Sequence, residues 1–212
     1  MQIDSIVPVT KDRNRVILDT GESFVIYKGE QRILKLTENS ELPEDTYNRI
    51  MTVILPKRAK LRAMNLLKVR PYTEYQLRRK LSEGGYPDTV SEIAIEYVKS
   101  FGYIDDKAYA VDFIKSQTDC RSKKELYLKL SQKGIQREVL DYAFNVTYGS
   151  YSDAHDECSF DETEVIIKAL QKRHFTGNET YEERQKLLAY FYRRGFEMDN
   201  VFKAMDQLGG SK

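Results

Sequence analysis

The sequence predicts a mainly α fold, in which tandem three-helix, helix-turn-helix-like repeats form an elongated, curved solenoid behind a small N-terminal antiparallel β segment. Three observations support this prediction. Only 11 glycines and 5 prolines occur in 212 residues, which favours long helices with short connections. Hydrophobic residues make up 41% and charged residues 32% of the chain, which fits a well-solvated helical protein. One pattern of apolar residues and glycine also occurs three times.

The β segment is expected in residues 1–42. Short β-branched or aromatic runs lie within residues 3–9, 16–18 and 24–27, and polar turn residues separate them. The stretch from Asp19 to Glu22 contains a glycine and indicates a hairpin. Three short strands cannot bury both faces of a sheet, so we expect this meander to pack on the helices that follow.

Helical periodicity begins at Pro43. A leading helix is predicted over residues 44–55, and Pro56 should kink or restart it. The next helix is predicted to carry Leu61 and Met64 on its apolar face. It should end before Pro71, because the residue preceding a proline disfavours the α conformation.

The repeated pattern places apolar residues eight and four positions before a glycine. Its three copies are Leu77, Leu81 and Gly85; Leu126, Leu130 and Gly134; and Leu187, Phe191 and Gly195. The two apolar residues lie one turn apart on the same helix face, and the glycine suits the left-handed position that ends a helix. An alanine follows nine residues after each glycine, at Ala94, Ala143 and Ala204. Each pattern therefore predicts a helix, a turn and a further helix.

The starts of these helices carry cap signals. Thr73 and Ser122 stand where N-cap residues are expected, whereas the third copy has Glu183 at that position and is therefore degenerate. In the first copy, the helix after the glycine is expected to turn Ile93, Ala94 and Val98 inward. One further helix precedes each pair, so the repeating unit has three helices.

The repeats divide the chain into segments, and the linker is marked by composition. Residues 150 to 164 carry six acids and neither Lys nor Arg, and the start of this stretch is poor in helix formers. The predicted segments are the β meander 1–42, a first repeat 43–103, a second repeat 104–149, an acidic linker 150–160 and a third repeat 161–208.

A net charge of +1 conceals a strongly basic block. Residues 57–80 contain nine basic side chains and one acid. Such clusters attract phosphate backbones, although a solvated helix face is the alternative interpretation. Tyr72 and Tyr75 lie beside the block and could stack on bases, although most of the 15 tyrosines are expected to pack inside the protein. The candidate residues for contact with DNA or a filament are Lys57, Arg58, Lys60, Arg62, Lys68, Arg70, Arg78, Arg79, Lys80, Lys123 and Lys124.

Catalysis is not expected. The chain has no phosphate-binding glycine loop, and its two histidines, His155 and His174, form no recognisable catalytic group. His155 and Cys158 lack further ligands at zinc-site spacing, and Asp105 with Asp106 fits a helix start better than a carboxylate pair. We therefore predict no catalytic residue, no metal and no cofactor.

The expected location is the cytoplasm. The longest apolar stretch, around residues 50–55, is far shorter than the roughly 20 residues that span a bilayer, and no secretory signal is recognisable. Cys120 and Cys158 are then expected to be free thiols. We expect a monomer without membrane contact.

Three stretches resemble the RecX family. They are residues 63–81, in which Arg70 precedes Thr73, Glu74 and Leu77; residues 102–106, Gly-Tyr-Ile-Asp-Asp; and residues 129–135. The resemblance covers about residues 58–208. It implies tandem three-helix repeats without catalysis. It also implies binding to the RecA recombinase filament, with modulation of its ATPase, strand-exchange and co-protease activities in DNA repair and the SOS response.

A second hypothesis stays open. A three-helix unit with a basic second helix can also act as a stand-alone helical nucleic-acid-binding module. The resemblance favours a filament regulator that also contacts single-stranded or double-stranded DNA. Binding to DNA alone and to recombinase-coated DNA distinguishes the two hypotheses.

Overall fold

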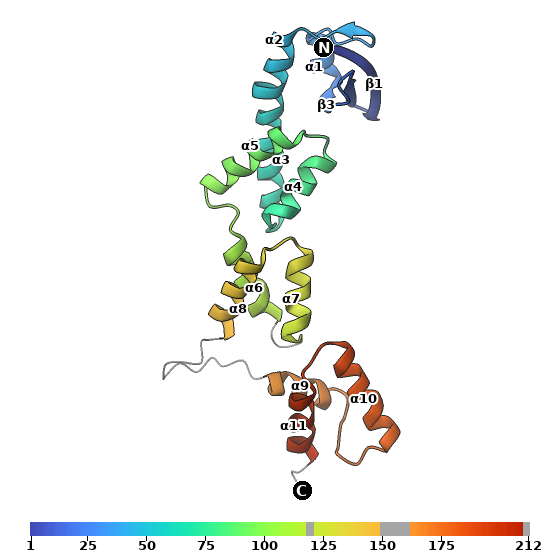
Figure 1. Cartoon of the computed structure of the whole chain (residues 1–212), viewed down its shortest axis with the longest axis vertical. Helices are drawn as coiled ribbons and strands as arrows, with labels where there is room; N and C mark the ends of the chain where they lie inside the picture. Colours follow the sequence, from blue (N-terminus) through green and yellow to red (C-terminus); the bar gives the residue numbers. More distant parts are fainter. Residues whose placement is uncertain (118–120, 149–161, 210–212) are drawn as a thin grey trace. The chain divides into compact units, whose positions relative to one another are not determined.

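The computed structural model describes residues 1–117, 121–148 and 162–209, and these form two compact units, Met1–Asp105 and Asp106–Lys212. Figure 1 shows the helices and strands of each unit. The predicted acidic linker, Cys120, His155 and Cys158 lie outside the described residues. Within the described part of the chain, no helix combines the length and the apolar character that crossing a bilayer requires. The same residues contain no cluster of three or more His, Cys, Asp or Glu suited to a metal.

The N-terminal sheet is antiparallel, as predicted, but it has four strands. These are β1 (Gln2–Thr10), β2 (Arg13–Leu18), β3 (Ser23–Tyr27) and β4 (Ser40–Glu41), in the order β3-β2-β1-β4. Gly21, in the predicted hairpin, has a φ of 83°. The prediction of three strands missed β4, because a two-residue strand has no periodicity. It also missed the short helix α1 (Lys28–Ile33).

One nearly continuous helical segment follows the sheet. It comprises α2 (Glu44–Arg49), the π-helical turn η1 (Ile50–Ile54) and α3 (Leu55–Val69). Pro56 lies in the first turn of α3, directly after the π-helical turn, so the helical segment changes its hydrogen-bond pattern at the proline and continues as an α-helix. The helix ends before Pro71, as predicted.

The three repeats have the same build. Each has a leading helix and a pair joined by the glycine turn: α3 with α4 (Glu74–Glu83) and α5 (Asp88–Ser100); α6 (Asp106–Gln117) with α7 (Lys123–Gln132) and α8 (Arg137–Tyr148); and α9 (Glu162–Gln171) with α10 (Tyr181–Arg193) and α11 (Met198–Gly209). The leading and last helices of each repeat pack together. The predicted fold class of helical repeats behind a β segment is therefore confirmed. The elongated, curved stacking stays a prediction.

The glycine turns are nearly identical in the three copies. Gly85, Gly134 and Gly195 have φ values of 81°, 80° and 77°. In each copy, the residue after the glycine donates its backbone N–H to the carbonyl of the apolar residue that lies four positions before the glycine. These distances are 3.1–3.3 Å, and the arrangement closes the end of the helix. A shared local geometry thus explains why the spacing is conserved among the copies.

The predicted inward residues are mostly buried. Leu77, Leu81, Leu126, Leu130 and Phe191 are fully buried, and so are the three alanines that follow the glycines. Two predictions were wrong. Leu61 is 57% exposed while Ala59 and Ala63 are buried, and Ile93 is 42% exposed while Ile95 is buried. In both helices, small or neighbouring apolar residues form the packed face, and the periodicity alone did not distinguish between the two apolar stripes.

The prediction that the third copy has Glu183 at the N-cap position was wrong. Thr73 and Ser122 are the N-caps of α4 and α7, as predicted. The N-cap of α10 is Thr180, and its hydroxyl and the Glu183 carboxylate form a capping box. Glu183 is therefore the third residue of the helix, and α10 begins one turn earlier than the glycine spacing predicted.

Within residues 1–117, 121–148 and 162–209, the buried apolar side chains form three clusters. The sheet and the first repeat share one core, which joins Ile3, Phe24 and Ile26 to residues such as Leu77 and Val98. The second repeat and the third repeat each have a core of their own. Packing of the sheet on the first repeat confirms the expectation that the strands need the helices to bury their inner face.

Candidate functional site

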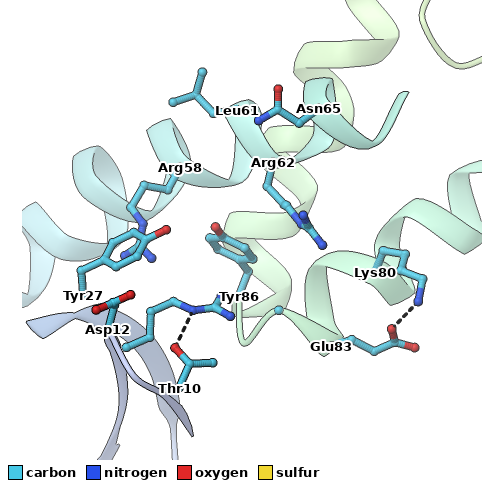
Figure 2. Close-up of a pocket in the computed structure, with 12 residues that line it drawn as sticks. Thr10, Asp12, Tyr27, Arg58, Leu61, Arg62, Asn65, Lys80, Glu83 and Tyr86 are labelled. Atoms are coloured by element: carbon cyan, nitrogen blue, oxygen red, sulfur yellow. Dashed lines mark hydrogen bonds and ion pairs between the residues drawn. The ribbon is translucent and has the colours of Figure 1, made fainter. Parts of the chain in front are cut away.

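A groove between the sheet and the first repeat collects several residues of the basic block. It has a volume of about 900 Å³ and lies within the first unit. Figure 2 shows Tyr27 and Asp12 on the sheet side, and Arg58, Leu61 and Arg62 on α3. The lining residues are Thr10, Asp12, Arg13, Tyr27, Arg58, Leu61, Arg62, Asn65, Lys80, Glu83, Gly84 and Tyr86. Four cationic side chains thus face two carboxylates.

Helix periodicity explains why α3 supplies two of the cations. Arg58 and Arg62 are four residues apart and lie on one face, beside Leu61 and Asn65. Lys60 points elsewhere, because its ammonium lies 4.8 Å from the centre of the Tyr97 ring on α5. The basic block is consequently divided between different surfaces of the first repeat.

Arg58 ties the sheet to α3. Its guanidinium forms an ion pair with Glu30 at 3.0 Å, lies 4.1 Å from the centre of the Tyr27 ring, and donates to the Val25 carbonyl at 3.4 Å. Only 13% of its side chain is exposed. Arg58 therefore helps to build the groove wall, and its charge is largely compensated by Glu30.

Arg13 is a groove residue that the sequence analysis missed. It begins β2, is paired with Tyr27 across the sheet, and its Nε donates to the Thr10 hydroxyl at 3.4 Å. A lone arginine in a predicted strand gives no signal of function. Its place beside the basic block follows only from the packing of the sheet on α3.

The hydroxyl of Tyr86 lies in the electrostatic field of the groove arginines. Burial raises the pKa of its phenol, while the charges of Arg58, Arg13 and Arg62 lower it in part. Three arginines that come from two different elements thus act on one hydroxyl. The arrangement favours an anion over a neutral ligand at this position.

The other end of the block is largely paired. Arg79 and Lys80 both contact the Glu83 carboxylate, at 3.0 and 2.7 Å, and their hydrogen bonds lower the pKa of Glu83. Arg78 lies between Glu74 and Glu92, and its bond to Glu92 is the main reason that its pKa is raised. Glu83 and Glu92 lie outside residues 57–80, and their ion pairs reduce the excess charge expected from this block.

The remaining candidates are dispersed. Lys57, Lys68 and Arg70 are exposed on or just after α3, and the Arg70 guanidinium lies 4.5 Å from the centre of the Tyr72 ring. Tyr72 is only 8% exposed, so of the two roles open to it, packing and stacking on bases, the structure supports packing. Tyr75 remains 50% exposed.

Lys123 and Lys124 belong to the second unit. Both line another groove, of about 620 Å³, together with Glu162, Arg193 and residues of the turn after α10. Lys123 also lies 4.6 Å from the centre of the Tyr148 ring. Ser122 next to them is fully buried and donates to the Arg194 carbonyl at 2.6 Å, which joins the second and third repeats.

This architecture defines a class of protein, in which tandem three-helix repeats follow an N-terminal sheet and cationic side chains line a groove between the sheet and the first repeat. Residues 59–97 match the family model described as RecX, first three-helix domain, and residues 161–205 match that of the third. In these two segments the chain is therefore similar to the RecX family.

Curated relatives show the same similarity, and solved structures share the fold. The regulatory protein RecX of Caldanaerobacter subterraneus is 28% identical over 82% of both chains, and that of Clostridium botulinum strain Eklund 17B is 27% identical over 90% of this chain and 87% of the relative. A crystal structure of regulatory protein RecX superposes with a TM-score of 0.60 at 21% identity, covering 100% of this chain and 99% of the other. The crystal structure of RecX from Lactobacillus salivarius has a TM-score of 0.58 at 21% identity, covering 73% and 97%. These structures share the fold.

Proposed function

We propose that this protein binds the RecA recombinase filament and its DNA, and that it modulates the ATPase, strand-exchange and co-protease activities of the recombinase. Similarity to the RecX family carries this proposal, because the curated relatives are named as regulatory proteins. The regulator acts by binding and has no catalytic activity of its own. It works as a monomer in the cytoplasm.

The surface chemistry supports contact with both components of a filament. A recombinase filament presents DNA phosphates next to protein. The groove offers arginines for phosphates, while the ion-paired face around Arg78, Arg79 and Glu83 offers mixed charge for protein. Lys123 and Lys124 add a second basic position in the other unit.

A pull-down tests the partner directly. Immobilised protein is mixed with RecA in the presence and absence of ATP and single-stranded DNA. We expect retention of RecA to rise strongly when both are present, since only then does the filament form. Equal retention of free RecA would contradict filament recognition. Retention of DNA without any retention of RecA would instead favour a stand-alone nucleic-acid-binding module.

A further inference from the structure

Arg13 and Arg62 differ from the other cations of the groove. Arg58 is paired with Glu30, and Lys80 with Glu83. Among the residues that the structure describes, neither Arg13 nor Arg62 has a carboxylate within ion-pair distance. Two guanidinium groups with unused donors therefore face the same cavity, one from the start of β2 and one from α3.

We propose that this groove binds the backbone of single-stranded nucleic acid, with Arg13 and Arg62 as phosphate ligands. The inference rests on the proposed function and assigns its DNA contact to a particular site. Guanidinium groups bind phosphate oxygens through two parallel hydrogen bonds, so two such groups select a chain with repeated phosphates. The N-terminal sheet then forms one wall of the DNA site.

The aromatic residues favour a single strand over a duplex. Tyr27 is 44% exposed and lines the groove with Tyr86. Figure 2 shows both rings in the space between the sheet and α3. Unpaired bases can stack on such rings, whereas the bases of a duplex are already stacked on one another. A volume of about 900 Å³ is enough for a group of nucleotide size.

The backbone around the groove argues against a mononucleotide such as ATP. Gly84, the glycine of the lining, is the C-cap of α4. The carbonyl groups at a helix C-terminus carry partial negative charge, which disfavours the concentrated charge of a triphosphate. P-loop and Rossmann proteins instead place the N-terminus of a helix next to the phosphates of the nucleotide. Phosphates spaced along a strand can meet the arginines and avoid this end.

Fluorescence anisotropy with a labelled 20-nucleotide oligothymidylate tests the site in the full chain. For the double variant Arg13→Ala, Arg62→Ala we expect weaker binding. The slope of log affinity against log salt should fall by about 1.4, because each lost phosphate contact removes about 0.7 from a single-strand slope. The double variant Arg32→Ala, Arg49→Ala is the matched control, since both arginines are exposed in the first unit and outside the groove. It should keep the wild-type slope.

Further arms separate the possible ligands. The single variants Arg13→Gln and Arg62→Gln should each lower the salt slope by about half as much as the double variant does. They keep the test usable if the double variant folds poorly. An abasic oligonucleotide should bind the wild type roughly 5- to 150-fold more weakly for one lost stacking contact. The affinity for a duplex of equal length should differ little between the wild type and the double variant. Competition by ATP at the affinity of the oligonucleotide would overturn the proposal.

The failure of this site can be distinguished from failure of the proposed function. If the groove variants bind the oligonucleotide with the wild-type affinity and salt slope, the site assignment is wrong. The regulator proposal then still stands, provided that the wild-type protein retains RecA filaments. If the wild type binds neither the oligonucleotide nor the filament, both proposals fail.

Discussion

The backbone N–H of Val25 donates to the carbonyl oxygen of Gly85 at 3.1 Å, and this bond joins β3 to the turn between α4 and α5. The glycine that follows the end of α4 is therefore also a contact point for the sheet. The side chain of Val25 occupies the space where a Cβ at position 85 would lie, 2.1 Å from its Cγ2. The repeated glycine has an additional role in the first copy, because it lets the sheet pack closely enough to form the groove.

Replacing Gly85 by alanine should be costly for two reasons. A left-handed φ of 81° costs an alanine roughly 1–2 kcal/mol, and the clash with Val25 adds to this. We expect a total loss of more than about 2 kcal/mol in the free energy of unfolding, measured by urea denaturation. Gly102→Ala is the control, because φ is 69° there and the Cβ would meet no atom within 4 Å. Equal losses for the two variants would contradict the close approach of the sheet.

The core of the second repeat gives a second prediction. Leu126 and Leu130 are fully buried in its cluster, so each change to alanine should lower the free energy of unfolding by about 2–5 kcal/mol. Leu128 lies on the same helix but is 57% exposed. Leu128→Ala should therefore change the free energy of unfolding by less than about 0.5 kcal/mol. Chemical denaturation of the three variants checks the prediction. A loss at Leu128 as large as that at Leu126 would mean that the assigned helix face is wrong.

Acid should weaken the first repeat through Glu74. Burial raises the pKa of this carboxyl, but hydrogen bonds from Arg78 and Lys99 outweigh burial and leave the pKa below its ordinary value. A lowered pKa means that the folded state favours the carboxylate. The stabilisation is therefore complete above the unfolded pKa of about 4.3 and is lost as the pH falls through the folded pKa.

Thermal melts of wild type and Glu74→Gln test this effect. We expect the variant to have a lower Tm than the wild type at pH 7, and the difference to shrink by pH 3, where the wild-type carboxyl loses its advantage. The other carboxyl groups titrate in both proteins and cancel in the comparison. A difference in Tm that stays constant from pH 7 to pH 3 would show that ionised Glu74 contributes nothing.

Much of the helical fold could be predicted because it depends on local rules. The glycine after Leu81 or Leu130 needs a left-handed backbone, and a leucine four residues earlier must face the core, so the spacing alone identifies the helix pair. The same rule located α10 but misplaced its start. Thr180 and Glu183 form a capping box one turn upstream, and the glycine spacing does not determine helix length.

The site could be predicted only in part. Arg62 and Lys80 were candidates because charge density is visible in the sequence, and both line the groove. The pairing of Lys80 with Glu83 and of Arg58 with Glu30 was not visible, since it depends on side-chain geometry and on the packing of α1. Arg13 was missed for the same reason. A groove between elements far apart in sequence has no local signature.

The effect on recombinase activity tests the central proposal most directly. Purified protein is titrated into RecA on single-stranded DNA, and ATP hydrolysis and strand exchange are followed. If binding blocks filament growth, both rates should fall at concentrations of the protein well below that of RecA, and the inhibition should weaken with salt. If both rates stay unchanged over a wide range of concentrations, the protein does not regulate the filament and the account is wrong.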